Sequence, residues 1–71
     1  MSNKQIGENM KILRGKRNWK RSYVSKRAEI DENRYKLLER SERVPTWEEL
    51  FKISRLYGIT IDDLMFKKIE K

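Results

Sequence analysis

Basic side chains that could bind a polyanion gather in one short stretch of the sequence. Residues 14–27 hold seven Lys or Arg and no Asp or Glu, in the run RGKRNWKRSYVSKR. The whole chain of 71 residues has a net charge of +7, so this stretch carries as many positive charges as the net excess. A dense basic stripe attracts DNA, RNA or an anionic membrane surface. The alternative is a solvated face that only keeps the protein soluble, and the charge run alone does not decide between them.

The side chains that most enzymes and metal sites need are missing. The sequence has no Cys and no His, which removes the usual zinc ligands, disulfides and the Ser-His-Asp and Cys-His catalytic arrangements. It shows no Gly-rich phosphate loop and no paired-carboxylate cleft, and Asp62 and Asp63 are better explained as acids in the first turn of a helix. We therefore predict a protein that is not an enzyme and takes no cofactor, metal or small molecule.

The sequence also indicates in which compartment of the cell the protein is found. No apolar run approaches the roughly 18 residues of a membrane span, and the first residues lack the apolar stretch of a signal peptide. Membrane association through residues 14–27 is disfavoured, since the core needs the apolar side chains in and next to that segment, Trp19, Val24 and Ala28. We predict a cytoplasmic protein with no membrane partner.

Apolar residues recur at helical spacing along nearly the whole chain. Ile6, Met10 and Leu13 share one face of a first helix that ends near Gly15 and Asn18. A second helix is expected at about 20–28 and a third at about 32–40. Asp31 is a suitable N-cap for the third helix.

Two further helices follow the single proline, Pro45. Thr46 and Glu49 have the spacing of a capping box that opens a fourth helix, which Gly58 ends. Thr60 opens a fifth helix. The expected apolar stripes of these two helices are Trp47, Leu50, Ile53 and Leu56, then Ile61, Leu64 and Met65. The pattern predicts one all-α domain of five helices over residues 1–71, with a helix-turn-helix at about 20–40 and a helical C-terminal tail at 60–71.

The segment from Ile6 to Met65 resembles the helix-turn-helix domain of Cro and lambda-type phage repressors, the XRE family. The resemblance rests on the order and spacing of Ile6-Gly7-Glu8, Leu13-Arg14, Ile30-Asp31, Leu38-Glu39-Arg40, Arg43-Val44-Pro45-Thr46 and Tyr57-Gly58-Ile59-Thr60-Ile61-Asp62-Asp63-Leu64. It implies a five-helix lambda-repressor-like fold. It also implies a place in the cytoplasm of a bacterium or a phage-infected host cell.

The resemblance assigns DNA-binding roles to particular positions. The third helix would lie in the major groove, where an Asn side chain suits adenine and a Lys suits guanine. The start of the second helix, at Lys20 and Arg21, would meet a phosphate. The expected set is Arg14, Lys20, Arg21, Glu32, Asn33, Arg34, Lys36, Arg40 and Arg43. Arg14 also matches a family pair with Glu39, so a structural salt bridge is its alternative role.

The sequence departs from the family pattern at the turns around the third helix. Glu29 and Ser41 stand where the family usually has Gly, which predicts strained left-handed backbone at both. Glu29, Asp31 and Glu32 also place three acids at the start of the recognition helix, where they would repel phosphates.

Two functions fit these features. The first is a sequence-specific, Cro-like transcriptional regulator that binds a double-stranded DNA operator. If it binds as a weak homodimer, the two half-sites of the operator are expected to lie about 34 Å apart. The second is an antirepressor or modulator that binds a partner repressor protein through the same helix-turn-helix surface. Antitoxins also use this fold, but no residue of this sequence points to an antitoxin role. The expected protein contacts are Tyr23 and Leu37 on the helix-turn-helix, and Ile61, Met65, Phe66 and Ile69 on the fifth helix and tail.

Overall fold

The computed structural model describes residues 3–71, and this part of the chain folds into helices without any strand. The helices are α1 (Asn3–Lys16), α2 (Arg21–Ala28), α3 (Glu32–Glu39), α4 (Trp47–Tyr57) and α5 (Ile61–Phe66). The predicted all-α, five-helix fold is confirmed. None of these helices has both the length and the apolar character that crossing a membrane requires.

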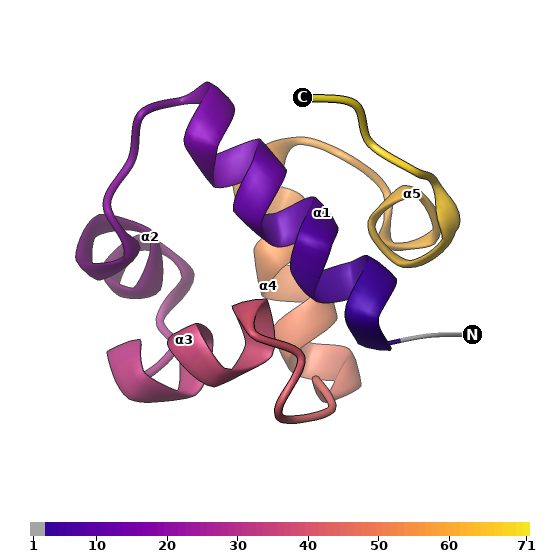
Figure 1. The fold of residues 1–71 in the computed structure, drawn as a ribbon. Helices are drawn as coiled ribbons and strands as arrows, with labels where there is room; N and C mark the ends of the chain where they lie inside the picture. Colours follow the sequence, from indigo (N-terminus) through magenta and orange to yellow (C-terminus); the bar gives the residue numbers. More distant parts are fainter. Residues whose placement is uncertain (1–2) are drawn as a thin grey trace.

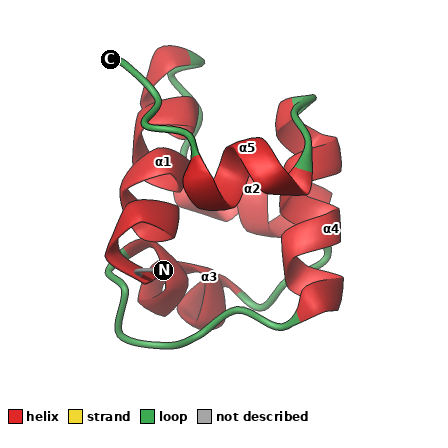
Figure 2. Cartoon of the chain, turned by 90° about the vertical axis from the view of Figure 1, so that its right-hand side faces the viewer, coloured by secondary structure: helices red, strands yellow, loops and turns green. Residues whose placement is uncertain are grey.

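The helices pack around one core. In Figure 1, α1 crosses the front of the molecule with α4 behind it, α2 and α3 lie on one side, and α5 lies on the other. Direct packing joins α1 to α3 and α5, α2 to α3 and α4, and α4 to α5. The view in Figure 2 shows the loop from α3 to α4 running along one edge of the molecule. The α2–α3 pair is therefore held by α1, which packs on α3, and by α4, which packs on α2.

Local capping signals explain where the later helices begin. The Asp31 carboxylate accepts a hydrogen bond from the Arg34 amide at 3.1 Å at the start of α3. The Thr46 and Glu49 side chains each bond the other's backbone N–H, which completes the capping box of α4. The Thr60 hydroxyl caps α5 through the Asp63 amide at 2.9 Å. All three predicted N-caps are confirmed.

The turns on both sides of α3 use left-handed backbone at residues other than glycine. Glu29 has φ = 58° and Ser41 has φ = 61°, as their replacement of the family's usual Gly predicts. A side chain in this region costs roughly 1 kcal/mol relative to glycine. At Glu29 this geometry closes the end of α2, where the Ile30 amide donates to the Ser25 carbonyl at 2.9 Å. At Ser41 it closes the end of α3, where the Glu42 amide donates to the Leu37 carbonyl at 2.9 Å.

The core largely follows the predicted stripes. The buried apolar residues of the described part are Ile6, Met10, Leu13, Val24, Ala28, Ile30, Tyr35, Leu38, Leu50, Ile53, Tyr57, Leu64 and Met65. Trp47 is wrongly predicted, since its side chain is 70% exposed. It is the first residue of α4, and the spacing of three residues from Trp47 to Leu50 to Ile53 falls short of the helical repeat of about 3.6. The stripe therefore drifts around α4, and its first member leaves the core.

The predicted helical tail is wrong beyond Phe66, where α5 ends. The cause is Asn9, a buried polar residue of α1. Its amide nitrogen donates to the carbonyls of Leu64 and Lys67 at 2.9 and 2.7 Å, and its amide oxygen accepts from the Ile69 N–H at 3.2 Å. These are backbone groups that a continuing helix would pair internally, so Asn9 holds the tail non-helical against α1.

Candidate nucleic-acid interface

The beginning of α2 lacks a side-chain cap. Lys20 is the N-cap residue in an extended conformation and makes no capping hydrogen bond, and the first turn contains no acid. The orphan N–H groups and the helix dipole make this end electropositive. The Lys20 side chain is exposed and Arg21 is half-buried. Both predicted phosphate-binding residues therefore lie where an anion would satisfy the uncapped backbone.

The residues expected to read bases lie beside this helix end. Arg21 of α2 and Glu32, Asn33 and Lys36 of α3 together line an open hollow of about 330 Å³. The hollow therefore contains two cations, one amide and one carboxylate. These groups can donate and accept hydrogen bonds toward base edges and phosphates.

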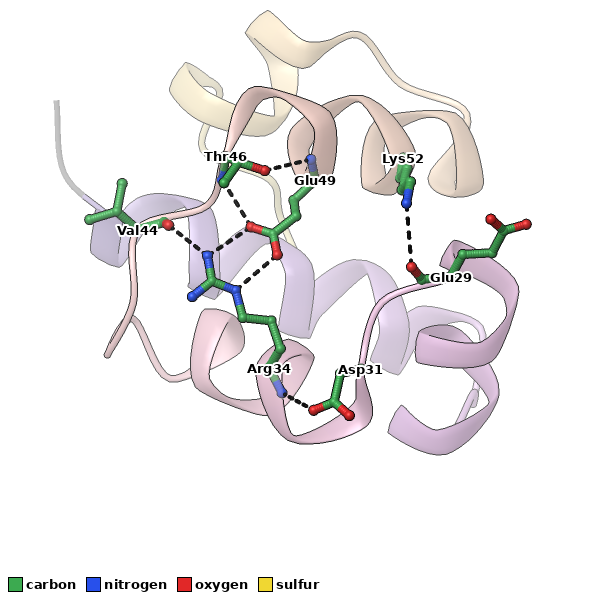
Figure 3. Close-up of polar contacts among 7 residues, drawn as sticks. All are labelled: Glu29, Asp31, Arg34, Val44, Thr46, Glu49 and Lys52. Atoms are coloured by element: carbon green, nitrogen blue, oxygen red, sulfur yellow. Dashed lines mark hydrogen bonds and ion pairs between the residues drawn. The ribbon is translucent and has the colours of Figure 1, made fainter.

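Arg34 lies outside this hollow. Figure 3 shows its side chain turned toward α4, where Nε and Nη2 donate to the two carboxylate oxygens of Glu49 at 2.8 and 2.9 Å. Nη2 also donates to the Val44 carbonyl at 3.0 Å. The hydrogen bond between the two side chains raises the pKa of Arg34 and lowers the pKa of Glu49. Arg34 thus links α3 to α4 and its loop, and this link competes with any contact to DNA.

Sequence reasoning missed Glu49 as the partner of Arg34. The capping box uses one carboxylate oxygen of Glu49, at 2.9 Å from the Thr46 N–H. A carboxylate accepts several hydrogen bonds, so a capping Glu keeps capacity for a bidentate Arg. This remaining capacity indicates that Glu49 can bind an Arg. Arg34 is 15 positions away, however, and sequence spacing alone does not identify it as that Arg.

Arg14 forms the structural salt bridge with Glu39 that was its alternative role. Nε and Nη2 contact the Glu39 carboxylate at 2.6 and 3.2 Å, and Nη1 donates to the Trp19 carbonyl at 3.0 Å. The Glu39 side chain is only 1% exposed. The hydrogen bond to Glu39 raises the pKa of Arg14. Arg14 therefore joins α1 to the end of α3 and to the segment before α2.

The predicted cations after α3 point outward. Arg40 pairs with Glu42 at 2.8 Å, with both side chains about half exposed. Arg43 is exposed and donates to the Glu42 carbonyl at 3.0 Å. Both side chains are exposed beside the α3–α4 loop.

The acids near α3 have different roles. Asp31 caps the helix, and Glu32 lies in the hollow with Asn33. The Glu29 carboxylate is exposed, while its backbone carbonyl accepts a long hydrogen bond of 3.4 Å from Lys52 Nζ (Figure 3). Glu29 and Glu32 are therefore the acids that a bound phosphate backbone would meet.

The predicted protein-contact residues divide by exposure. Tyr23 and Phe66 are exposed, whereas Leu37 is half-buried. Ile61 and Ile69 pack against the core and are half-buried. Met65 is buried, so the structure places it in the core and away from any surface that a second chain could contact.

The Arg34–Glu49 link predicts an acid-sensitive stabilisation. The pKa of Glu49 is lowered below its ordinary value of 4.5. The stabilisation is therefore complete above that value and is lost as pH falls through the lower, folded-state pKa. Glu49→Gln keeps a residue that suits the third position of a capping box. We expect it to lower the free energy of unfolding by roughly 1–2 kcal/mol at neutral pH and by much less near pH 3, measured by urea denaturation. The control is Glu48→Gln, on an exposed neighbour, and an equal effect of the two variants would contradict the prediction.

Comparison with known proteins returns one finding. A family model described as helix-turn-helix matches residues 10–64, which include α2, α3, α4, the second half of α1 and the beginning of α5. No curated protein and no solved structure matches the chain significantly.

Proposed function

Because the chain belongs to the XRE-type helix-turn-helix family of Cro and lambda repressors, we propose that it is a Cro-like regulator that binds a DNA operator with α3 in the major groove. The family consists of DNA-binding transcription regulators and is generally not enzymatic. One observation gives the main support for operator binding by α3. The uncapped, basic start of α2 lies next to Asn33 and Lys36 of α3 in a single hollow.

The proposed mechanism divides the work between phosphate and base contacts. The backbone N–H groups at the start of α2, with Lys20 and Arg21, hold one phosphate and set the position of the protein on the duplex. Arg40 and Arg43 hold the backbone on the other side of α3. Asn33 and Lys36 then face base edges, where Asn pairs with adenine and Lys with guanine acceptors.

Selection of a random duplex library on the purified protein tests this function. At about 0.15 M salt, non-specific attraction to phosphates is already weakened. Enrichment of a two-fold symmetric motif indicates two copies on half-sites about 34 Å apart, and a single short motif indicates a monomer. No enrichment at all would refute operator recognition.

Two substitutions separate the proposed roles. Asn33→Ala is expected to relax sequence preference at one base pair by roughly 1–3 kcal/mol. Arg21→Ala is expected to weaken binding to all sequences alike and to reduce the salt slope by about one unit. Both are measured by fluorescence anisotropy with the selected duplex and its single-base variants over a salt series. Uniform behaviour of the two variants across sequences would contradict the assigned roles.

The charges in and near the hollow that contains Asn33 and Lys36 favour a second candidate function. Glu49 holds Arg34 away from the hollow, and Glu32 places negative charge in its lining. An antirepressor that binds a partner repressor through Tyr23, Leu37 and the basic start of α2 would tolerate these features better than a DNA reader. In that case Tyr23→Ala and Arg21→Glu would abolish partner binding, and the duplex selection would give no motif.

A further inference from the structure

The outward face of α4 carries large apolar side chains that the fold does not cover. Trp47 and Phe51 are one helical turn apart and are 70% and 51% exposed. Val44, in the loop just before α4, is exposed as well. Single exposed apolar residues are ordinary, but neighbouring exposed aromatic residues on one face indicate a contact surface.

A hollow of about 540 Å³ lies next to Phe51, between the end of α2 and α4. Its wall on the α2 side consists of Arg27, Ala28 and Glu29, and its wall on the α4 side consists of Glu48, Phe51, Lys52, Arg55 and Leu56. Leu56 also packs against the core, so the hollow has an apolar part. None of these residues lines the hollow that contains Asn33 and Lys36.

The charges around this hollow are only partly satisfied. Lys52 lies 3.8 Å from the Glu48 carboxylate and also contacts the Glu29 carbonyl. By contrast, Arg27 and Arg55 make no ion pair within residues 3–71. The Arg55 guanidinium lies 5.5 Å from the centre of the Phe51 ring. The surface thus offers two arginines without carboxylate partners, Arg55 beside the Phe51 ring and Arg27 at 5.9 Å from the centre of the Tyr23 ring. It also holds the exposed carboxylate of Glu29.

The chemistry of this surface selects its occupant. DNA phosphates would neutralise the arginines but would leave the rings of Trp47 and Phe51 in water. A second copy would cover the rings, but it brings another net charge of +7 to the contact. A carboxylate-rich segment with a large apolar side chain satisfies both the arginines and the rings, and exposed Trp and Arg are the residues that most often dominate such contacts.

We propose that the hollow between α2 and α4, with Phe51, Arg55 and Arg27 at its edge, binds an acidic segment of another protein. An apolar side chain of that segment enters the hollow against Phe51 and Leu56, and flanking carboxylates pair with the two arginines. Because this surface and the α3 hollow share no residue, the protein partner is expected to bind independently of DNA.

Selection of a library of random linear peptides on the immobilised full chain tests the proposal. Enriched peptides are expected to place Asp or Glu beside a large apolar residue. Phe51→Ala and Arg55→Glu should each weaken their binding by about tenfold or more. Ile12→Ala is the control, since Ile12 of α1 is half-buried and lines other hollows than this one, and it should leave binding unchanged. Replacing an exposed acid at the hollow, Glu48→Lys, should strengthen binding by about two- to fivefold.

Several results would overturn the proposal. These are the absence of enriched peptides, a consensus without acids, or an equal loss of peptide affinity in Phe51→Ala and Ile12→Ala. Sedimentation equilibrium of the free protein supplies a further test. A dimer that Phe51→Ala dissociates would assign this face to a second copy. A duplex that displaces the peptides from the wild type but not from Arg55→Glu would assign it to DNA.

Discussion

Replacing Arg14 with methionine is expected to lower the free energy of unfolding by about 3–5 kcal/mol, because it leaves the Glu39 carboxylate buried without a counter-charge. The Glu39 side chain is 1% exposed and the Arg14 side chain 21%, so little water can reach the carboxylate once the guanidinium is gone. The substitution also removes the donor to the Trp19 carbonyl before α2. Methionine fills much of the same apolar volume, so the loss reports mainly on charge and hydrogen bonding.

A second ion pair in the chain provides the control for this measurement. Arg40 pairs with Glu42 at 2.8 Å, but both side chains are about half exposed. Arg40→Met should therefore cost no more than about 1 kcal/mol in the same urea titration. A double variant separates the buried charge from other effects of the substitution. Arg14→Met with Glu39→Gln should be more stable than Arg14→Met alone, because the amide is uncharged. A double variant as unstable as the sum of the single ones would contradict a role for the buried charge.

The features that could be predicted from the sequence are those in which a side chain acts on backbone a few residues away. Asp31, Thr46 and Thr60 each cap an amide three residues later, so their spacing alone identified the helix starts. The left-handed backbone at Glu29 and Ser41 followed from the family's preference for Gly at these turns. The resemblance also brought Asn33, Lys36 and Arg21 to one surface, as the structure does.

The features that could not be predicted depend on which distant residue a side chain meets. Asn9 ends the helical tail through backbone groups at Leu64, Lys67 and Ile69, which are separated from it by 55 or more positions. Nothing near Asn9 in the sequence marks it as buried. Arg34 has the position of a base-reading residue, but the Glu49 carboxylate across the α3–α4 loop holds it. This contact is bidentate and charge-assisted, so a contact of Arg34 with DNA would have to replace it.

A Gly→Ala substitution is expected to change the stability of the protein in opposite directions at two glycines of α1. An added Cβ at Gly7 would lie 2.5 Å from the Glu39 carbonyl oxygen and 2.8 Å from the Leu38 carbonyl oxygen, so α1 and α3 would have to separate. Backbone atoms cannot turn aside as a flexible side chain can. At Gly15 an added Cβ meets nothing within 4 Å. Gly7→Ala is therefore expected to destabilise the protein by about 1–3 kcal/mol, whereas Gly15→Ala should stabilise it by roughly 0.5–1 kcal/mol.

Thermal and urea unfolding of the two variants measure this difference, and a gain of stability in both would contradict the close approach at Gly7. The comparison also tests how α3 is positioned for the proposed contact with DNA. Glu39 contributes both the carbonyl that Gly7 approaches and the carboxylate that Arg14 binds, two turns further along α1. Both contacts hold the same end of α3, the helix proposed to enter the major groove, so Gly7→Ala should weaken binding to a selected duplex even at temperatures where the variant is fully folded. Gly15→Ala should leave duplex binding unchanged, because Gly15 lies outside this joint between α1 and α3.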